Sequence, residues 1–329
     1  MDYSFAVITY NSSRYIIETL ESIKYQIQRF GTGKEIELVL GDDASSDGTV
    51  ALMEAWLKEN DRLFTAVRKS YHEHNTGTCK NCADVWRLVT SEKMKELAGD
   101  DILPANNIFE LLDQCADGLV LQGEAILFQE GRIIDDFSRY QELLVQSLYS
   151  VKDIKFLSEV CSPMANGVFC KRSMFTPEII SYVEKFRLIE DQPLWYRVFH
   201  DIPDVQYRFI ERPVVLYRSE GQGVSAQKHG TVSEAAQKDD VTLRSDIARE
   251  KNWLSRHIYK ERLWANHSPH RVLHIFSPDS LYYKIHGIMS SGELKFLWER
   301  ERQCFREQEE YLREIQERAA SFVKRNVST

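Results

Sequence analysis

The chain has 329 residues, of which 43% are hydrophobic and 28% are charged, and its formal net charge is −8. This length suffices for one large domain with an appended region, or for two domains. The negative charge argues against a general nucleic-acid-binding protein, which needs a basic surface to neutralise phosphates.

The chain contains no run of eighteen apolar residues, and no basic segment precedes an apolar one at the N-terminus. We therefore expect neither a membrane span nor a signal peptide, and place the protein in the cytoplasm.

Six scattered cysteines do not form the pattern of a disulfide framework, so we expect reduced thiols. Cys79 and Cys82 lie close to His72 and His74, and the four side chains could be combined into a zinc site. Structural zinc sites usually have regular arms of the form C-x₂-C and H-x₃₋₅-H. Here the two histidines are only two positions apart, with Glu73 between them, and a flexible segment separates them from the cysteines. This spacing disfavours zinc.

The first hundred residues alternate between strand and helix patterns. An apolar run at residues 3–9 predicts a buried strand, and a 3–4 spacing of apolar residues from Ile16 to Phe30 predicts a helix that Gly31–Gly33 ends. The same alternation continues through further predicted strands at residues 36–40, 64–67 and 97–98, and helices that contain Met53, Trp56 and Leu57 or span 79–89. This order predicts an α/β fold with a parallel sheet.

Polar loops follow three of these strands. The carboxyl ends of parallel strands meet at one edge of a sheet, so Thr9, the pair Asp42 and Asp43, and the pair Asp100 and Asp101 should converge on one crevice. Paired carboxylates suit Mg²⁺ or Mn²⁺. The alternative for the second pair is a solvated start of a helix near Pro104, where negative charge is favourable.

No glycine-rich dinucleotide fingerprint and no Walker A sequence is present, so a metal would have to hold any phosphates. Four strings in register resemble the family 2 glycosyltransferases of GT-A fold: Ile8-Thr9-Tyr10-Asn11, Gly41 to Thr49, Asn75-x-Gly77-x₃-Asn81 and Gly99-Asp100-Asp101. The resemblance continues through Gly167–Arg172, Glu190-Asp191, and Tyr217-Arg218 to Ser225, and so covers about residues 1–225.

This resemblance implies a GT-A (Rossmann-like), mostly parallel sheet flanked by helices, with a helical C-terminal extension. It implies a glycosyltransferase domain at 1–225, with a nucleotide-sugar-binding half at 1–115 and an acceptor half at 116–225, followed by a helical region at 226–329. The implied reaction is an inverting, Mn²⁺- or Mg²⁺-dependent transfer of a sugar from a nucleoside diphosphate. UDP is the expected donor nucleotide, and a glycan or lipid-linked glycan of a bacterial surface polysaccharide is the expected acceptor.

The resemblance also assigns roles to residues. Asp191 would be the general base, with Glu190 beside it to orient it or contact the acceptor, and Asp100 and Asp101 would hold the metal. Thr9 and Asp43 would bind the nucleobase, and Asp42 or the adjoining loop the ribose. The whole expected nucleotide-sugar site comprises Thr9, Asn11, Asp42, Asp43, Asn75, Gly77, Asp100 and Arg218.

The sequence departs from the family pattern at two positions: Ala98 replaces a common acidic residue, and Glu220 replaces a common histidine. A catalytically degenerate carbohydrate- or nucleotide-binding protein of the same fold is therefore one alternative. A nucleotidyltransferase is another, although its glycine-rich N-terminal loop is absent. Glu190 and Asp191 have an alternative too, because acidic residues commonly begin helices.

The C-terminal region reads as helical, with breaks at Ser268-Pro269 and Ser277-Pro278. Its last segment has an apolar stripe interrupted by Glu301 and Gln308 and made up of Trp298, Phe305, Leu312, Ile315, Ala319 and Phe322. Such a stripe is compatible with a coiled coil between two chains, with contact to a membrane surface, or with packing on the flank of the enzyme itself.

Overall fold

A computed structural model describes residues 1–160, 167–220, 231–250 and 278–327. The predicted loop up to Ser225, the break at Ser268-Pro269 and the serine of Ser277-Pro278 lie outside these ranges.

The N-terminal half contains four parallel strands in the order β3-β2-β1-β4. They are β1 (Tyr3–Thr9), β2 (Ile36–Asp42), β3 (Ala66–Tyr71) and β4 (Lys93–Ala98). Every residue of β1 and β2 is buried, as expected for the centre of a parallel sheet that is covered on both faces. Strand β3 starts at Ala66 rather than Phe64, because a 3₁₀ turn over Asp61–Leu63 lengthens the preceding connection.

Three helices connect these strands: α1 (Ile16–Phe30), α2 (Thr49–Asn60) and α3 (Thr78–Leu88). The short helix α4 (Ile108–Leu112) begins later than the sequence predicts. Its cap is Asn107, whose side chain accepts a hydrogen bond from the backbone N–H of Phe109 (3.0 Å). The expected helix start near Pro104 is therefore wrong, and the carbonyl of Pro104 instead accepts from Gln26 (2.5 Å).

The sheet continues through the second half of the chain. Strand β7 (Val168–Lys171) runs antiparallel between β4 and β5 (Leu119–Gln129), and β8 (Gln206–Arg218) pairs in parallel with β5. The two-residue strand β6 (Arg132–Ile133) completes the sheet. The helices of this half are α5 (Phe137–Val160), α6 (Pro177–Val183), α7 (Asp191–Asp201) and α8 (Thr231–Glu250). The predicted α/β class with a mostly parallel sheet flanked by helices is confirmed.

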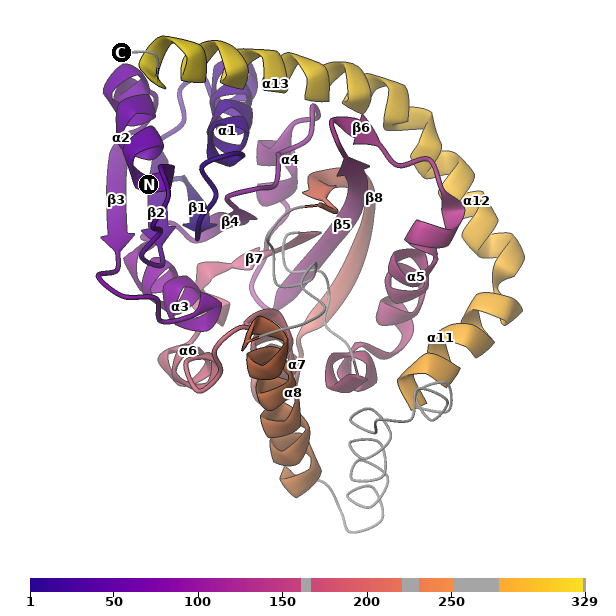
Figure 1. The fold of residues 1–329 in the computed structure, drawn as a ribbon. Helices are drawn as coiled ribbons and strands as arrows, with labels where there is room; N and C mark the ends of the chain where they lie inside the picture. The colour runs from indigo at the N-terminus through magenta and orange to yellow at the C-terminus, as the bar shows by residue number, and fades with distance from the viewer. Residues whose placement is uncertain (161–166, 221–230, 251–277, 328–329) are drawn as a thin grey trace.

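The C-terminal helices α11 (Pro278–Met289), α12 (Ser291–Glu301) and α13 (Phe305–Val327) return to the first half of the molecule. Figure 1 shows α13 lying across α1 and α2. The apolar stripe is at most 8% exposed and belongs to the same cores as β1, α1 and β5. Packing of the stripe on the flank of the molecule itself is thus confirmed, and because the stripe is buried there it is not free for a coiled coil or a membrane.

The polar residues that interrupt the stripe are buried as well. Gln308 accepts a hydrogen bond from the backbone N–H of Ala105 (2.9 Å), and Glu301 is 4% exposed. None of the helices in the described ranges is long and apolar enough to cross a bilayer. The division at residue 225 stays a prediction.

Candidate active site

A cleft of about 1730 Å³ opens where β1 and β4 end and where β2 and β3 lead into their loops. This volume exceeds the usual size of a single small-ligand pocket. All predicted site residues except Asp42 line it: Thr9, Asn11, Asp43, Asn75, Gly77, Asp100, Asp101, Glu190, Asp191 and Arg218. The fold therefore brings together side chains that are up to 209 positions apart (218 − 9) in the sequence.

Asp42 lies behind the cleft wall and is 1% exposed. Its carboxylate accepts hydrogen bonds from the hydroxyl of Thr9 (2.8 Å) and from the backbone N–H and hydroxyl of Ser45 (2.8 and 2.5 Å). The hydroxyl of Ser45 in turn accepts from the N–H of Asn11 (2.7 Å). Of the two expected ribose contacts, Asp42 or the adjoining loop, Asp42 is the one that does not line the cleft. It holds the first two loops together, while Ser46 and Asp47 of the adjoining loop line the cleft.

Asp43 anchors the loop after β3. One carboxylate oxygen accepts from the N–H and hydroxyl of Thr76 (2.7 and 2.8 Å), and the other accepts from the N–H of Gly77 (2.7 Å). Burial raises the pKa of Asp43, but the hydrogen bonds from Thr76, His72 and Gly77 outweigh burial and lower it overall. The side chain is therefore a fixed, ionised acceptor at the edge of the cleft.

His72 has a structural environment that accounts for it without zinc. Its two ring nitrogens lie 3.0 Å from a carboxylate oxygen of Asp43 and 3.1 Å from one of Asp84. Cys79 and Cys82 are fully buried, and burial raises the pKa of both thiols. Within the described ranges no three His, Cys, Asp or Glu side chains form a group that could hold a metal ion.

A glycine is required at position 77 because the backbone of Arg187 approaches it closely. Its φ is +99°, and a Cβ at this position would lie 2.3 Å from the carbonyl oxygen of Arg187. The same carbonyl accepts from the N–H of Cys79 (3.2 Å), and the Arg187 guanidinium donates to the side-chain oxygen of Asn75 (2.9 Å). The expected nucleotide loop is thus packed directly against the segment that precedes Glu190 and Asp191.

Asp100 and Asp101 follow β4. Asp101 is 1% exposed, and its carboxylate accepts the N–H of Arg218 (2.9 Å). Burial raises the pKa of both carboxyls, repulsion from Asp100 raises that of Asp101 further, and Arg218 opposes the rise in each. The alternative of a solvated helix start is therefore wrong for this pair.

The pair fits a divalent cation. Mg²⁺ is usually bound through one or two protein carboxylates together with substrate phosphates, rather than by a complete protein cage. Among the described residues no group of three or more His, Cys, Asp or Glu side chains could hold a metal ion, so these two adjacent carboxyl groups would need substrate oxygens to complete the ligand set. The repulsion from Asp100 that raises the pKa of Asp101 is also what a bound cation would relieve.

Arg218 closes this part of the cleft, but its charge is already neutralised. The guanidinium donates to Glu18 (2.5 Å) and to the carbonyl of Asp100 (2.8 Å), and it lies 4.0 Å from the centre of the Tyr15 ring. Glu220, which replaces the common histidine, lies 3.4 Å from the same guanidinium. These contacts fix the loop of Asp100 and leave little net positive charge for a phosphate.

Glu190 and Asp191 stand at the start of α7, where each side chain is half-buried. Glu190 precedes the first helical residue and makes no side-chain capping bond, whereas Asp191 accepts the N–H of Gln192 (2.7 Å). Burial, followed by repulsion from Asp191, raises the pKa of Glu190 well above its usual range. The pair thus combines a carboxyl that favours its neutral form with a second carboxylate in the same cleft.

Four basic residues of the cleft were not anticipated: Arg14, Arg139, Arg187 and Lys238. They come from separate parts of the chain and have no common sequence pattern. Lys238 belongs to α8, so the C-terminal part of the chain contributes to the cleft wall.

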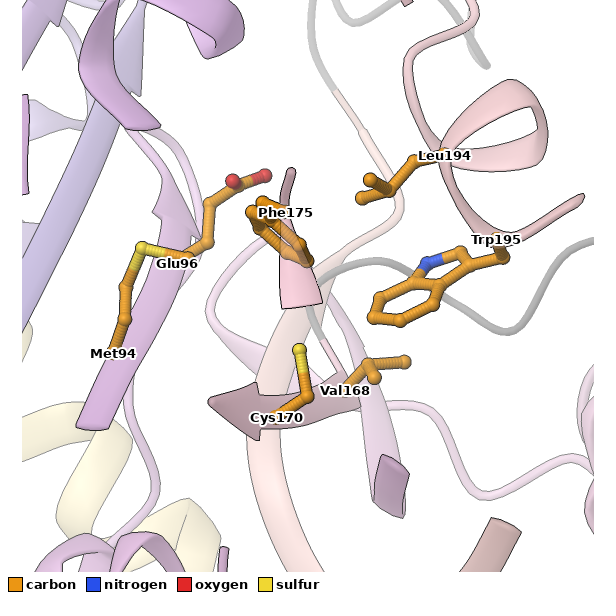
Figure 2. Close-up of a pocket in the computed structure, with 7 residues that line it drawn as sticks. All are labelled: Met94, Glu96, Val168, Cys170, Phe175, Leu194 and Trp195. Carbon is orange, nitrogen blue, oxygen red and sulfur yellow. The ribbon is translucent and has the colours of Figure 1, made fainter. Parts of the chain in front are cut away.

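A second, much smaller cavity of about 20 Å³ lies between β4, β7 and α7 (Figure 2). It is lined by Met94, Glu96, Val168, Cys170, Phe175, Leu194 and Trp195. The indole N–H of Trp86 donates to Glu96, and the buried indole N–H of Trp195 has no hydrogen-bond partner among the described residues. This volume suits about one water molecule and is too small for a sugar or nucleotide.

Comparison with known proteins agrees with this architecture. Residues 4–144 match the profile of Glycosyl transferase family 2. A curated relative, the GalNAc(5)-diNAcBac-PP-undecaprenol beta-1,3-glucosyltransferase of Campylobacter jejuni, is 26% identical over 136 residues, which cover 41% of each chain. The match thus spans about two fifths of that relative.

Solved structures cover more of the chain. S. aureus TarS 1–349 in complex with UDP-GlcNAc has a TM-score of 0.57 at 17% identity, covering 95% of this chain and 92% of that one. A longer TarS structure is matched over 49% of its length, with a TM-score of 0.54 and 17% identity, covering 90% of this chain. The mannosyltransferase PcManGT from Pyrobaculum calidifontis, in complex with GDP-Man and Mn²⁺, has a TM-score of 0.52 at 16% identity, covering 97% and 86%. These structures confirm the GT-A-like fold, and residues 4–144 are similar to glycosyl transferase family 2.

Proposed function

We propose that the protein is a metal-dependent, inverting glycosyltransferase that moves a sugar from a nucleoside diphosphate to an acceptor hydroxyl. The observation that carries this proposal is that two acidic pairs, Asp100 with Asp101 and Glu190 with Asp191, line one cleft although they come from different elements. Asp100 and Asp101 suit a cation that binds a diphosphate, and the pair of Glu190 and Asp191 suits proton transfer.

UDP is the proposed donor nucleotide. Asp43 is held ionised by the N–H groups of Thr76 and Gly77, which prepares it to accept the N–H of a uracil ring. Thr9, Asn11 and the Ser46–Asp47 turn line the adjoining wall and would surround the base and ribose. TarS, which shares the fold, is described in complex with UDP-GlcNAc.

Asp100 and Asp101 would hold Mn²⁺ or Mg²⁺, with Arg218 fixing their loop from behind. When bound, such an ion neutralises the developing charge of the leaving diphosphate. PcManGT, of the same fold, is described with Mn²⁺.

Asp191 would act as general base. It takes the proton of the acceptor hydroxyl while that oxygen forms a bond to the anomeric carbon and the bond from this carbon to the diphosphate oxygen breaks. Attack from the face opposite the leaving group inverts the anomeric configuration. Glu190 favours its protonated form and would donate a hydrogen bond to Asp191 or to the acceptor.

The proposed acceptor is a hydroxyl of a glycan or lipid-linked glycan. The Campylobacter relative acts on an undecaprenol-linked glycan, as its name states. The cleft volume leaves space for an acceptor beside the donor. A lipid-linked acceptor would bring the enzyme to a membrane surface.

One specific observation supports a second candidate, a catalytically degenerate nucleotide- or carbohydrate-binding protein. Ala98 lines the cleft where the family commonly has an acidic side chain, so one expected ligand oxygen is missing. Such a protein would bind UDP or a sugar without turning it over.

The test begins with a panel of nucleotide sugars, each with and without Mn²⁺, followed by thermal unfolding. A ligand at about a hundred times its Kd should stabilise the folded state by about 2.7 kcal/mol. Release of UDP from the stabilising donor is then measured with and without metal. Metal-dependent release supports an enzyme, stabilisation without release supports the degenerate binder, and no stabilisation by any nucleotide sugar overturns both.

A further inference from the structure

A buried carboxylate on α8 binds three successive backbone N–H groups. Asp239 is 6% exposed, and its Oδ2 accepts hydrogen bonds from the N–H groups of Arg187 (2.9 Å), Leu188 (2.6 Å) and Ile189 (3.4 Å). Three donors on one carboxylate oxygen compensate its buried negative charge. They also fix the direction of the chain at residues 187–189.

This segment is the immediate lead-in to Glu190 and Asp191. On its other side it touches the expected nucleotide loop, since the Arg187 carbonyl accepts from Cys79 (3.2 Å) and the Arg187 side chain donates to Asn75 (2.9 Å). Residues 187–189 are therefore held between the nucleotide loop and α8. Removing Asp239 would free one of these two attachments.

Helix α8 also contacts the residue that follows the acidic pair. Arg244, which is 5% exposed, donates to the side-chain oxygen of Gln192 (3.3 Å), and its neighbouring nitrogens are held by Asp240 and by the carbonyl of Glu159. Further along, Glu250 of α8 accepts from Tyr196 of α7 (2.6 Å). Helix α8 is thus attached to the chain on both sides of the acidic pair, through residues 187–189 before it and through Gln192 and Tyr196 after it.

We propose that Asp239 is a positioning residue for the acidic pair Glu190 and Asp191. This inference rests on the proposed function and extends it to α8, which lies outside residues 4–144, the part that matches the family. Asp239 does not line the cleft and touches no reacting atom. It acts by holding the backbone N–H groups that set where α7 begins, and thereby where the Asp191 carboxylate meets the acceptor hydroxyl.

The test uses Asp239→Ala, Asp239→Asn and, as a matched control, Asp246→Ala. Asp246 lies on the same helix, and its carboxylate accepts hydrogen bonds from Tyr182 and Arg249 rather than from residues 187–192. We expect Asp239→Ala to lower kcat by about 10²-fold, the cost of misplacing a catalytic group by roughly 1 Å. The Kd for UDP with Mn²⁺, measured by calorimetry on the full chain, should change by less than about threefold.

Asp239→Asn should recover most of the activity, because its side-chain oxygen still accepts the three N–H groups at almost the same size. This variant also keeps the test valid if Asp239→Ala fails to fold. A wild-type kcat in the folded alanine variant would overturn the proposal. The proposal would also be overturned if Asp239→Asn lost activity only in proportion to a fall in its Tm, and if Asp246→Ala showed the same fall in Tm and the same loss.

Hydrogen exchange at residues 187–189 separates this inference from the proposed function. Faster exchange in Asp239→Ala than in Asp246→Ala supports the contribution of Asp239, and equal exchange in the two overturns it. If the wild type turns over no nucleotide sugar, the proposed function fails, and the exchange measurement still decides whether Asp239 holds this segment.

Discussion

Asp191 can be tested with a change that keeps its size and removes its basicity. Asp191→Asn should leave UDP and metal binding nearly unchanged and reduce transfer by about 10² to 10⁴, the usual contribution of a positioned general base. Asparagine begins a helix about as well as aspartate, so a purely structural role would tolerate the change. The measurement pairs steady-state transfer with calorimetric UDP binding.

Glu190→Gln is the matched comparison for this variant. If it alone were inactive, the roles of the two acids would have to be exchanged. A joint loss of transfer and UDP binding in Asp191→Asn would instead place this residue in the donor site.

Asp101 is best replaced by asparagine, because its carboxylate accepts the backbone N–H of Arg218 and asparagine keeps that bond. We expect Asp101→Asn to fold normally and to lose the Mn²⁺-dependent part of UDP affinity, since it removes one of two charges that attract the cation. Calorimetry with and without Mn²⁺ measures this. Asp117→Asn, which removes an exposed carboxylate paired with Lys171, is the charge-matched control. An unchanged metal dependence would remove Asp101 from the metal site.

At the scale of elements, the junction between β5 and α12 carries a buried ion pair. Glu124 of β5 lies 3.0 Å from the Arg300 guanidinium and is 7% exposed. Burial raises the pKa of Glu124 to about 7, although Arg300 opposes the rise. Between the ordinary value of 4.5 and about 7, the folded protein therefore holds a proton that the unfolded chain has released.

The proton that Glu124 holds in the folded protein stabilises the folded state relative to the unfolded chain. This stabilisation is fully present below about pH 4.5 and is lost as the pH rises towards 7. Glu124→Gln should therefore become more stable relative to the wild type across that window, by an amount on the order of 2 kcal/mol. Urea unfolding at several pH values measures the difference. Glu211→Gln, which removes the more exposed partner of Arg300, is the control, and a pH-independent difference for Glu124→Gln would contradict the assignment.

At the scale of the whole molecule, the C-terminal helices share a core with the sheet. Leu312 of α13 is fully buried in a cluster that also contains Ile126 of β5 and Leu216 of β8. Leu312→Ala should lower the free energy of unfolding by about 2–5 kcal/mol, as for other large-to-small core changes. The exposed neighbour Arg313→Ala should have little effect.

The number of unfolding transitions shows whether α13 unfolds together with the sheet or as a separate unit. A shared core predicts that fluorescence and circular dichroism report one common unfolding transition, which Leu312→Ala shifts as a whole. Two separated transitions, with only the smaller one shifted, would mean that α13 folds as an independent unit.

The sequence alone was sufficient for the features that depend on local pattern. Apolar runs and helical spacing placed β1, α1, β2 and α2, because these periodicities follow from backbone geometry within a few residues. The positions of Thr9, Asp100 and Asp101 near one edge also followed, because parallel strands present their carboxyl ends together.

Only the tertiary structure distinguished Asp42 from Asp43. Successive side chains at a strand end point in different directions, so one carboxylate is buried against Thr9 and Ser45 while the other faces the cleft. The sequence of two adjacent aspartates does not show which of them faces the cleft.

Contacts between distant segments could not be predicted from the sequence either. The stripe on α13 identified an apolar face but not its partner, because hydrophobic burial is non-directional and any apolar surface could cover it. Asp239 lies about fifty positions from residues 187–189, and its role depends on the packing of α8 against α7. Local patterns therefore determined the elements and the chemistry available at their ends, whereas the fold decided which side chains share the cleft and what holds them in place.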